Sequence, residues 1–283
     1  GRLRASSRDA VRSFGNSPPM RLPRLAAWRD AVNRKTSAWL TGLDVRRHCQ
    51  TCRGPSDAGP HCAACLEALP LNRWSCIRCA EPLLTPLPGP VLCAHCLTRM
   101  PAFDRVYAPL LYAPPVDHAT QALKFHGDLR AAQWLADWLD RHLPAIPTPN
   151  LVIPVPLHPT RIRARGYNQA LEIARPLTRA RGWTLAPDIA HRHRATRAQS
   201  ELDAEARRRN LKGAFHICGA VDDARVLIVD DVVTTAATAS SLAAALRTAG
   251  AAEVMVVAAA RTPHADSRRR VSATPGIPAP GRR

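Results

Sequence analysis

The sequence predicts an α/β protein with a mostly parallel sheet, preceded by a small metal-binding module. Three observations support this fold class. The 283 residues suffice for two modest domains. Eight of the nine cysteines fall between residues 49 and 96 as four CxxC pairs. From about Pro101 onward, strand patterns alternate with helical ones, which is typical of a parallel sheet.

Composition divides the chain into four segments. We expect a partly disordered N-terminal extension over 1–45, the metal-binding module over 46–100, the α/β domain over 101–264 and a disordered tail over 265–283. Met20 is a candidate start within the extension. No apolar run approaches the roughly 18 residues of a membrane span, and no signal peptide is visible, so we expect a cytoplasmic protein.

The charge of the chain is strongly positive. Of its 40 basic residues only Lys35, Lys124 and Lys212 are lysines, and the formal net charge is +18. This charge suggests an anionic partner such as phosphate or nucleic acid, although high-GC codon usage would also produce it. Aromatic residues make up only 5%, which argues against a long platform for stacking bases.

The cysteine pairs predict two structural zinc sites. Zinc takes four thiolates in a tetrahedron, so two CxxC turns close one site and leave no open position. Sequential pairing is our first choice, although an interleaved arrangement also fits the spacing, and His48, His61 or His95 could replace a ligand. Disulfides would require an oxidising compartment. The predicted ligands are Cys49, Cys52, Cys62, Cys65, Cys76, Cys79, Cys93 and Cys96.

Periodicity predicts the elements of the second domain. We expect strands near 106–112, 151–155, 214–217, 226–229 and 254–259, and helices over 117–125, 129–142, 168–181 and 235–248. In the second helix, apolar residues recur at helical spacing, so Trp134 and Trp138 should be packing residues. Cys218 stands alone and is expected to be a small buried hydrophobic residue.

The sequence predicts a strand that ends on two carboxylates. In "RVLIVDDVVTTAATAS" an apolar strand runs into Asp230 and Asp231, and small residues follow. Ligands of parallel sheets bind beyond the carboxyl ends of the strands, where backbone N–H groups of a following helix suit phosphate. Carboxylates accept hydrogen bonds from a vicinal diol. The stretch therefore predicts a site for a ribose 5-phosphate.

This stretch resembles the phosphoribosyl pyrophosphate (PRPP) motif of type I phosphoribosyltransferases. The chain from about 49 to 260 resembles the ComF family, which joins a double zinc-ribbon module to that fold. The resemblance is carried by the four CxxC pairs, "ALKFHGD", "IPVPLHPTRIRARGYNQA", "RATRAQSELDAEARRRNLKGAF" and the aspartate motif. It implies PRPP and magnesium as ligands and a link to natural transformation and DNA uptake, with competence proteins as partners.

The resemblance also assigns roles to residues. Asp230 and Asp231 match the pair that holds the ribose hydroxyls. The 5-phosphate loop matches Thr234, Thr235, Ala236, Ala237 and Thr238, with alanine where the motif usually has glycine at 236. If that position needs a positive φ, alanine costs about 1 kcal/mol or more and lowers PRPP affinity. An extended loop with arginines pointing the same way should face pyrophosphate through Arg161, Arg163 and Arg165.

A further set of arginines lies on the segment that resembles the hood of this fold. These nucleic-acid candidates are Arg192, Arg194, Arg197, Arg207, Arg208 and Arg209, for which a solvated surface is the alternative. Lys124 and His126 fall at a helix end, where cations suit the helix dipole.

Three functions follow as hypotheses. The first is a phosphoribosyltransferase that displaces pyrophosphate from C1 of PRPP, with magnesium and arginines stabilising the leaving group and no acceptor pocket identifiable. The second is a single-stranded DNA-binding competence factor with a non-catalytic PRPP site. The third is a zinc-ribbon module that recruits a partner protein.

Overall fold

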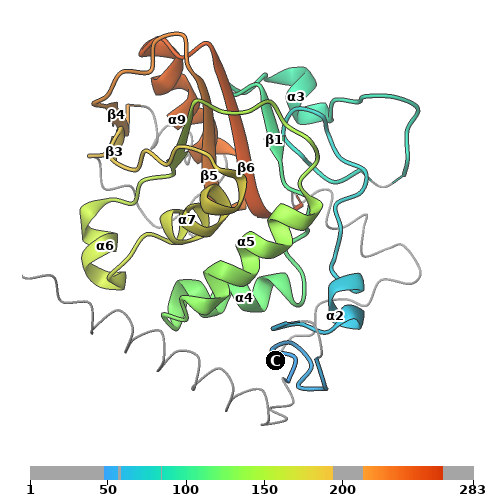
Figure 1. Cartoon of the computed structure of the whole chain (residues 1–283). Coiled ribbons are helices and arrows are strands. Elements are labelled where there is room, and N and C mark those ends of the chain that lie inside the picture. The colour runs from blue at the N-terminus through green and yellow to red at the C-terminus, as the bar shows by residue number, and fades with distance from the viewer. Residues whose placement is uncertain (1–47, 57–58, 84, 194–212, 264–283) are drawn as a thin grey trace, which may run out of the picture.

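A computed structural model describes residues 48–263, except 57–58, 84 and 194–212. Its centre is a four-stranded sheet in the order β1-β6-β5-β2 (Figure 1). The strands are β1 (Arg105–Tyr107), β2 (Leu151–Pro154), β5 (Arg225–Val233) and β6 (Glu253–Arg261). Every neighbouring pair in this sheet is parallel, which confirms the predicted fold class.

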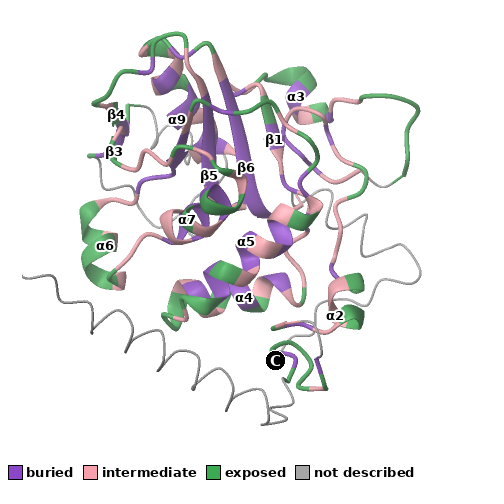
Figure 2. Ribbon diagram, in the orientation of Figure 1, coloured by how far each residue is buried: buried purple, intermediate pink, exposed green. Residues whose placement is uncertain are grey.

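Helices cover both faces of the sheet. One face carries α4 (Val116–Phe125), α5 (Arg130–His142) and α7 (Gln169–Arg181), and the other carries α9 (Ala237–Thr248). The buried residues follow the sheet closely (Figure 2). Each of these helices lies within two residues of its predicted bounds, because each has a continuous apolar stripe.

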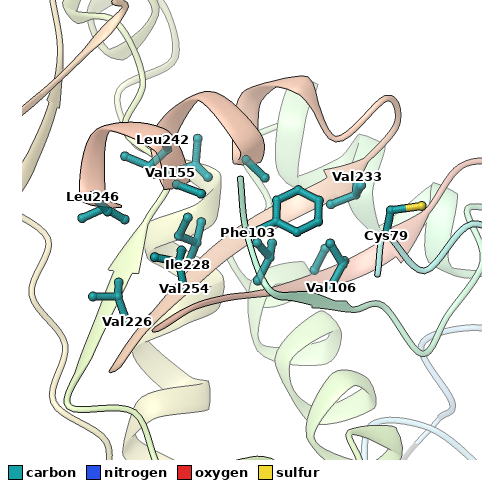
Figure 3. Close-up of a cluster of buried hydrophobic side chains, with 14 of the residues drawn as sticks. Cys79, Phe103, Val106, Val155, Val226, Ile228, Val233, Leu242, Leu246 and Val254 are labelled. Carbon is teal, nitrogen blue, oxygen red and sulfur yellow. The ribbon is translucent and has the colours of Figure 1, made fainter. Parts of the chain in front are cut away.

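Strict alternation along β5 separates the two halves of the core. Val226 and Ile228 pack on the α9 side, where Figure 3 shows them with Leu242 and Leu246. Leu227 and Val229 pack on the opposite side with the other three helices. Side chains of a strand point alternately to its two faces, so the residues that follow are also divided between the faces.

The two halves of the cysteine-rich module lie in different places. The first half ends in α2 (Ala63–Glu67) and contacts α5: the His61 ring lies 5.2 Å from the Trp134 ring and 4.8 Å from the Trp138 ring, centroid to centroid. These contacts agree with the packing role predicted for both tryptophans. The second half, ending in α3 (Ala94–Thr98), shares its buried cysteines with the core on the α9 side.

Four expectations about local structure are wrong. The arginines expected on an extended loop lie on a short helix, α6 (Pro159–Arg165), which begins at a proline with His158 as its N-cap. Strand β5 does not end at Asp230 but continues to Val233, because its pairing with β6 continues. The predicted strand at 106–112 is shortened to β1, with single bridges at Leu110 and Leu111.

The strand predicted near residues 214–217 is present, but it lies outside the main sheet. These residues form β4 (Phe215–Ile217), which pairs antiparallel with β3 (Ala190–Arg192) in a separate two-stranded sheet instead of joining the main one. The fourth wrong expectation concerns Cys218, which follows this strand and is exposed instead of buried, because the small sheet lies outside the parallel core. Among the described residues, no helix combines the length and apolarity needed to cross a membrane.

Candidate functional site

The eight clustered cysteines form two separate four-cysteine groups. Within each group, all four Sγ atoms lie within 4.8 Å of one another. The first group contains Cys49, Cys52, Cys62 and Cys65, and the second contains Cys76, Cys79, Cys93 and Cys96. The sequential pairing is therefore confirmed, and the described residues show no interleaved arrangement.

The spacing of the sulfur atoms fits zinc. A tetrahedron with zinc–sulfur bonds of about 2.3 Å has sulfur–sulfur edges of about 3.8 Å. The Sγ atoms of Cys52 and Cys62 are 3.8 Å apart, and those of Cys79 and Cys93 are 3.6 Å apart. The backbone N–H of Cys93 also donates to Cys76 Sγ at 3.3 Å, which favours the thiolate form that a metal requires.

The neighbouring histidine His61 has a different role. Its Nδ1 lies 3.0 Å from Thr51 Oγ1, and its ring packs against Trp134 and Trp138. The residue is only 6% exposed. His61 therefore fastens the first cysteine group to α5, while four thiolates remain for the metal.

We predict two zinc ions per chain, because each four-thiolate group completes one tetrahedron. Elemental analysis of protein purified without chelator measures the ratio. Titrating the thiols of the native protein is the control: Cys218, which is exposed, should react while the eight ligands stay protected. A ratio near zero with all nine thiols reactive would contradict the assignment.

The aspartate pair lies at the carboxyl end of the sheet and its two members face different sides. Asp231 is in an ion pair with Lys124 at the end of α4, with 2.9 Å between Nζ and Oδ2. Both side chains are partly shielded, with 30% of Lys124 and 13% of Asp231 exposed. Asp230 is directed by strand alternation to the α9 side, where its charge acts on Arg192 of β3.

The two carboxyl groups differ in acidity. Burial, and then the charge of Asp231, raise the pKa of Asp230 well above its usual range. Burial acts on Asp231 in the same direction, but the ion pair with Lys124 outweighs it and lowers the pKa of Asp231. Carboxylates in such a pair repel each other unless a cation or a shared proton offsets the charge, so the pair suits a hydroxyl-bearing ligand accompanied by a cation.

The predicted phosphate loop lies directly after β5. Residues 234–236 form the turn, and α9 begins at Ala237. Thr235 Oγ1 accepts a hydrogen bond from the Ala237 N–H at 3.4 Å. Ala236 has φ 57° and ψ 9°, which is the left-handed conformation, and its side chain offers no cap. Position 236, where the PRPP motif usually has glycine, thus has a backbone conformation that favours glycine.

We predict that Ala236→Gly stabilises the protein. A left-handed conformation costs an L-residue about 1–2 kcal/mol, whereas glycine tolerates it and loses about 0.5–1 kcal/mol in chain entropy. The free energy of unfolding, measured with urea, should rise by up to about 1 kcal/mol. Ala244→Gly, at an exposed position inside α9, is the matched control and should lower it by about 1 kcal/mol. A decrease for both variants would show that Ala236 is unstrained.

Helix α6 brings two of its three arginines to the site. Burial, and then the charge of Arg165, lower the pKa of Arg161. The charge of Arg161 in turn acts on Arg192, and that of Arg165 acts on Lys124. Arg192 and Lys124 are themselves influenced by the charge of Asp230, so this group of cations lies near the aspartate pair. Arg163 is exposed and lies two residues from each neighbour, about half a turn away, on the other side of the helix.

The structure describes only one of the six nucleic-acid candidates. Arg192 is 4% exposed, its Cζ lies 5.6 Å from the centre of the Phe215 ring, and burial lowers its pKa to about 10. Arg192 thus belongs with the aspartate pair. Arg194, Arg197, Arg207, Arg208 and Arg209 lie outside the described residues.

Sequence reasoning missed two contributions to this site. Lys124 was assigned only an interaction with the helix dipole, although its position in the last turn of α4 places it 2.9 Å from Asp231. Arg261 received no role, yet its guanidinium is fully buried and bonds to the carbonyls of Val233 and Thr234, where the phosphate loop begins. The sequence signal that could have identified Arg261 is its position as a charged residue at the end of an apolar strand.

No protein-family model matches the chain, but individual proteins do. It is 34% identical over 197 residues to the DNA utilization protein YhgH of Escherichia coli O157:H7, covering 66% of this chain and 85% of that protein. It is 32% identical over 158 residues to Competence protein F of Haemophilus influenzae, covering 49% of this chain and 64% of that protein.

Solved structures that match this chain include phosphoribosyltransferases. A purine phosphoribosyltransferase from Pyrococcus horikoshii covers 50% of this chain and 69% of its own, with 20% identity and a TM-score of 0.25. The match to a hypoxanthine phosphoribosyltransferase from Staphylococcus aureus covers 50% of this chain and 61% of that protein, with 13% identity and a TM-score of 0.26. The fold class is shown by the parallel sheet in the order β1-β6-β5-β2, with helices on both faces.

Proposed function

The chain belongs to the ComF family, and from this membership we propose that it binds PRPP with magnesium, in a role linked to the uptake or use of DNA. One observation carries the proposal. Two carboxylates with opposite pKa shifts lie near the carboxyl end of β5, and the left-handed Ala236 and the start of α9 follow a few residues later. The carboxylates can accept hydrogen bonds from a diol, and the backbone N–H groups at the start of α9, a few residues later, can bind a phosphate.

The cations around this pair match the remaining charge of the ligand. Lys124, Arg161, Arg165 and Arg192 act electrostatically on the aspartates or on one another. PRPP carries a pyrophosphate besides its 5-phosphate, and guanidinium groups bind such oxygens well. The repulsion between Arg161 and Arg165, four residues apart on one helix, would be offset by this anion.

Magnesium fits the same site. This cation is usually held by one or two carboxylates together with substrate phosphates, and Asp230 and Asp231 are the carboxylates available. Once bound, magnesium would neutralise charge on a pyrophosphate group. The lowered pKa of Asp231 keeps that carboxylate ionised at neutral pH, ready for a cation or a ribose hydroxyl.

Isothermal titration calorimetry with PRPP tests the proposal. We expect saturable binding near one PRPP per chain in magnesium, and at least about tenfold weaker binding in excess EDTA, since one lost charge interaction of about 1.4 kcal/mol is a factor of ten. Zinc must be measured after the EDTA step, so that loss of structural metal is not mistaken for loss of magnesium. Absence of PRPP binding in magnesium would reject the proposal.

Binding of single-stranded DNA is the second candidate function. Its supporting observation is an exposed aromatic ring beside the cationic site: Phe125 is 68% exposed, and Arg165 Cζ lies 5.8 Å from its ring centre. Bases stack on such rings, and arginine adds a cation–π contribution. In this alternative the PRPP site is non-catalytic and the arginines hold the DNA backbone.

A further inference from the structure

The last residue of β6, Arg261, is a fully buried cation. Its relative exposure is 0%, and it is in register with Val233 at the end of β5. Removing a guanidinium from water is costly unless nearly all its donors find partners. The segments that accept hydrogen bonds from Arg261 must therefore keep their positions relative to one another, or its buried donors would lose their partners.

One set of contacts holds the start of the phosphate loop. Arg261 Nη1 donates to the carbonyl oxygen of Val233 at 3.1 Å and to that of Thr234. The N–H of Thr262 also donates to the Val233 carbonyl at 2.9 Å. These bonds fix the backbone two residues before Ala236.

The other set of contacts holds the second cysteine group. Arg261 Nε donates to the carbonyl oxygen of Cys79 at 3.1 Å, and Nη2 donates to Glu81 Oε2 at 2.5 Å. Glu81 is itself 3% exposed, and its backbone carbonyl accepts from the Cys76 N–H at 2.8 Å. The turn that carries two metal ligands is thus bonded to the same guanidinium.

Both segments belong to one part of the core. Cys79 and Val233 are members of the same buried cluster (Figure 3). A cavity of about 790 Å³ is lined by Cys96 from the cysteine group, by Thr235 and Ala236 from the loop, and by Arg261. The first cysteine group instead contacts α5 through His61.

We propose that Arg261 is a positioning residue that couples metal binding at Cys76, Cys79, Cys93 and Cys96 to the order of the phosphate loop. The guanidinium is a rigid planar fork, so a shift of the Cys79 turn must either drag the loop carbonyls or leave buried donors unpaired. Metal loss at the second group should therefore loosen the loop, while loss at the first should not.

Hydrogen exchange with mass spectrometry on the full chain tests this coupling. Cys93→Ser removes one ligand from the second group, and Cys62→Ser is the matched control in the first group. We expect amide exchange in the peptide covering 232–240 to rise about tenfold in Cys93→Ser, as loss of about 1.4 kcal/mol of local stability would produce. In Cys62→Ser it should be unchanged. Equal effects in both variants, or none in Cys93→Ser, would overturn the proposal.

A second variant separates coupling from general loss of structure. Arg261→Lys keeps the charge opposite Glu81 but cannot bond both segments, so it should raise loop exchange while two zinc ions stay bound. In a double variant, adding Cys93→Ser to Arg261→Lys should raise amide exchange of the loop little further, because Arg261 no longer connects the cysteine group to the loop. Additive effects would show that Arg261 does not transmit the change.

Protection of β2 and α7 reports whether each variant is folded. If the Cys93→Ser variant loses this protection, the test depends on the Arg261→Lys variant alone. Unchanged amide exchange of the loop in Arg261→Lys would then overturn the proposal. The inference extends the proposed PRPP site, but its test contains no PRPP. Failure of PRPP binding and failure of the coupling are therefore separate results.

Discussion

Changing Asp230 and Asp231 together to alanine should weaken PRPP binding by about 100-fold or more. Each hydrogen bond from a ribose hydroxyl to a charged acceptor contributes about 1.5–3 kcal/mol, and the double variant removes both acceptors. It also leaves the Lys124 ammonium without its 2.9 Å partner, which misplaces a cation beside the site. Calorimetry in magnesium measures the change.

A matched control removes two negative charges elsewhere. Asp188 and Asp222 are both exposed, and Asp222 lies three residues before the start of β5. Changing these two to alanine alters the net charge equally but should leave PRPP affinity within about twofold, as expected for exposed, screened charges. Zinc content should stay at two per chain in both double variants. If the Asp230 and Asp231 variant binds PRPP as tightly as the parent, the phosphoribosyl site lies elsewhere.

Single-stranded DNA should bind with a steep dependence on salt. For single strands, each neutralised phosphate contributes about 0.7 to the slope of log affinity against log salt. With about five contacts, raising salt from about 50 to about 200 mM should lower affinity about 100-fold, with little dependence on sequence. Mobility shift or fluorescence anisotropy with a labelled oligonucleotide measures it. A dissociation constant that does not change with salt would contradict DNA binding through phosphates.

The arginines at 207, 208 and 209 provide the variant for this measurement. Changing all three to alanine should reduce the salt slope by about 2 if each contacts a phosphate. Arg141, Arg175 and Arg179, exposed on α5 and α7, form the control triple with the same loss of charge. Equal losses of affinity in the two triples would indicate attraction by net charge alone.

Local sequence patterns were enough to predict most helices and the chemistry of the short motifs. Apolar residues at helical spacing gave α4, α5, α7 and α9 nearly their observed bounds, because periodicity is encoded within each segment. The CxxC pairs indicated two metal sites, and the structure confirms their sequential grouping. The aspartate pair marked the end of the sheet at which ligands of such folds bind.

The contacts between residues far apart in the chain could not be predicted in the same way, because they depend on how the elements pack. The sheet order places β6 between β1 and β5, and this brings Arg261 to Glu81, which lies 180 residues away in the chain. It likewise places Lys124 against Asp231 and brings Arg192 within reach of the charge of Asp230. Spacing along a chain encodes the face on which a side chain lies, whereas the partner of a buried charge depends on which elements pack together.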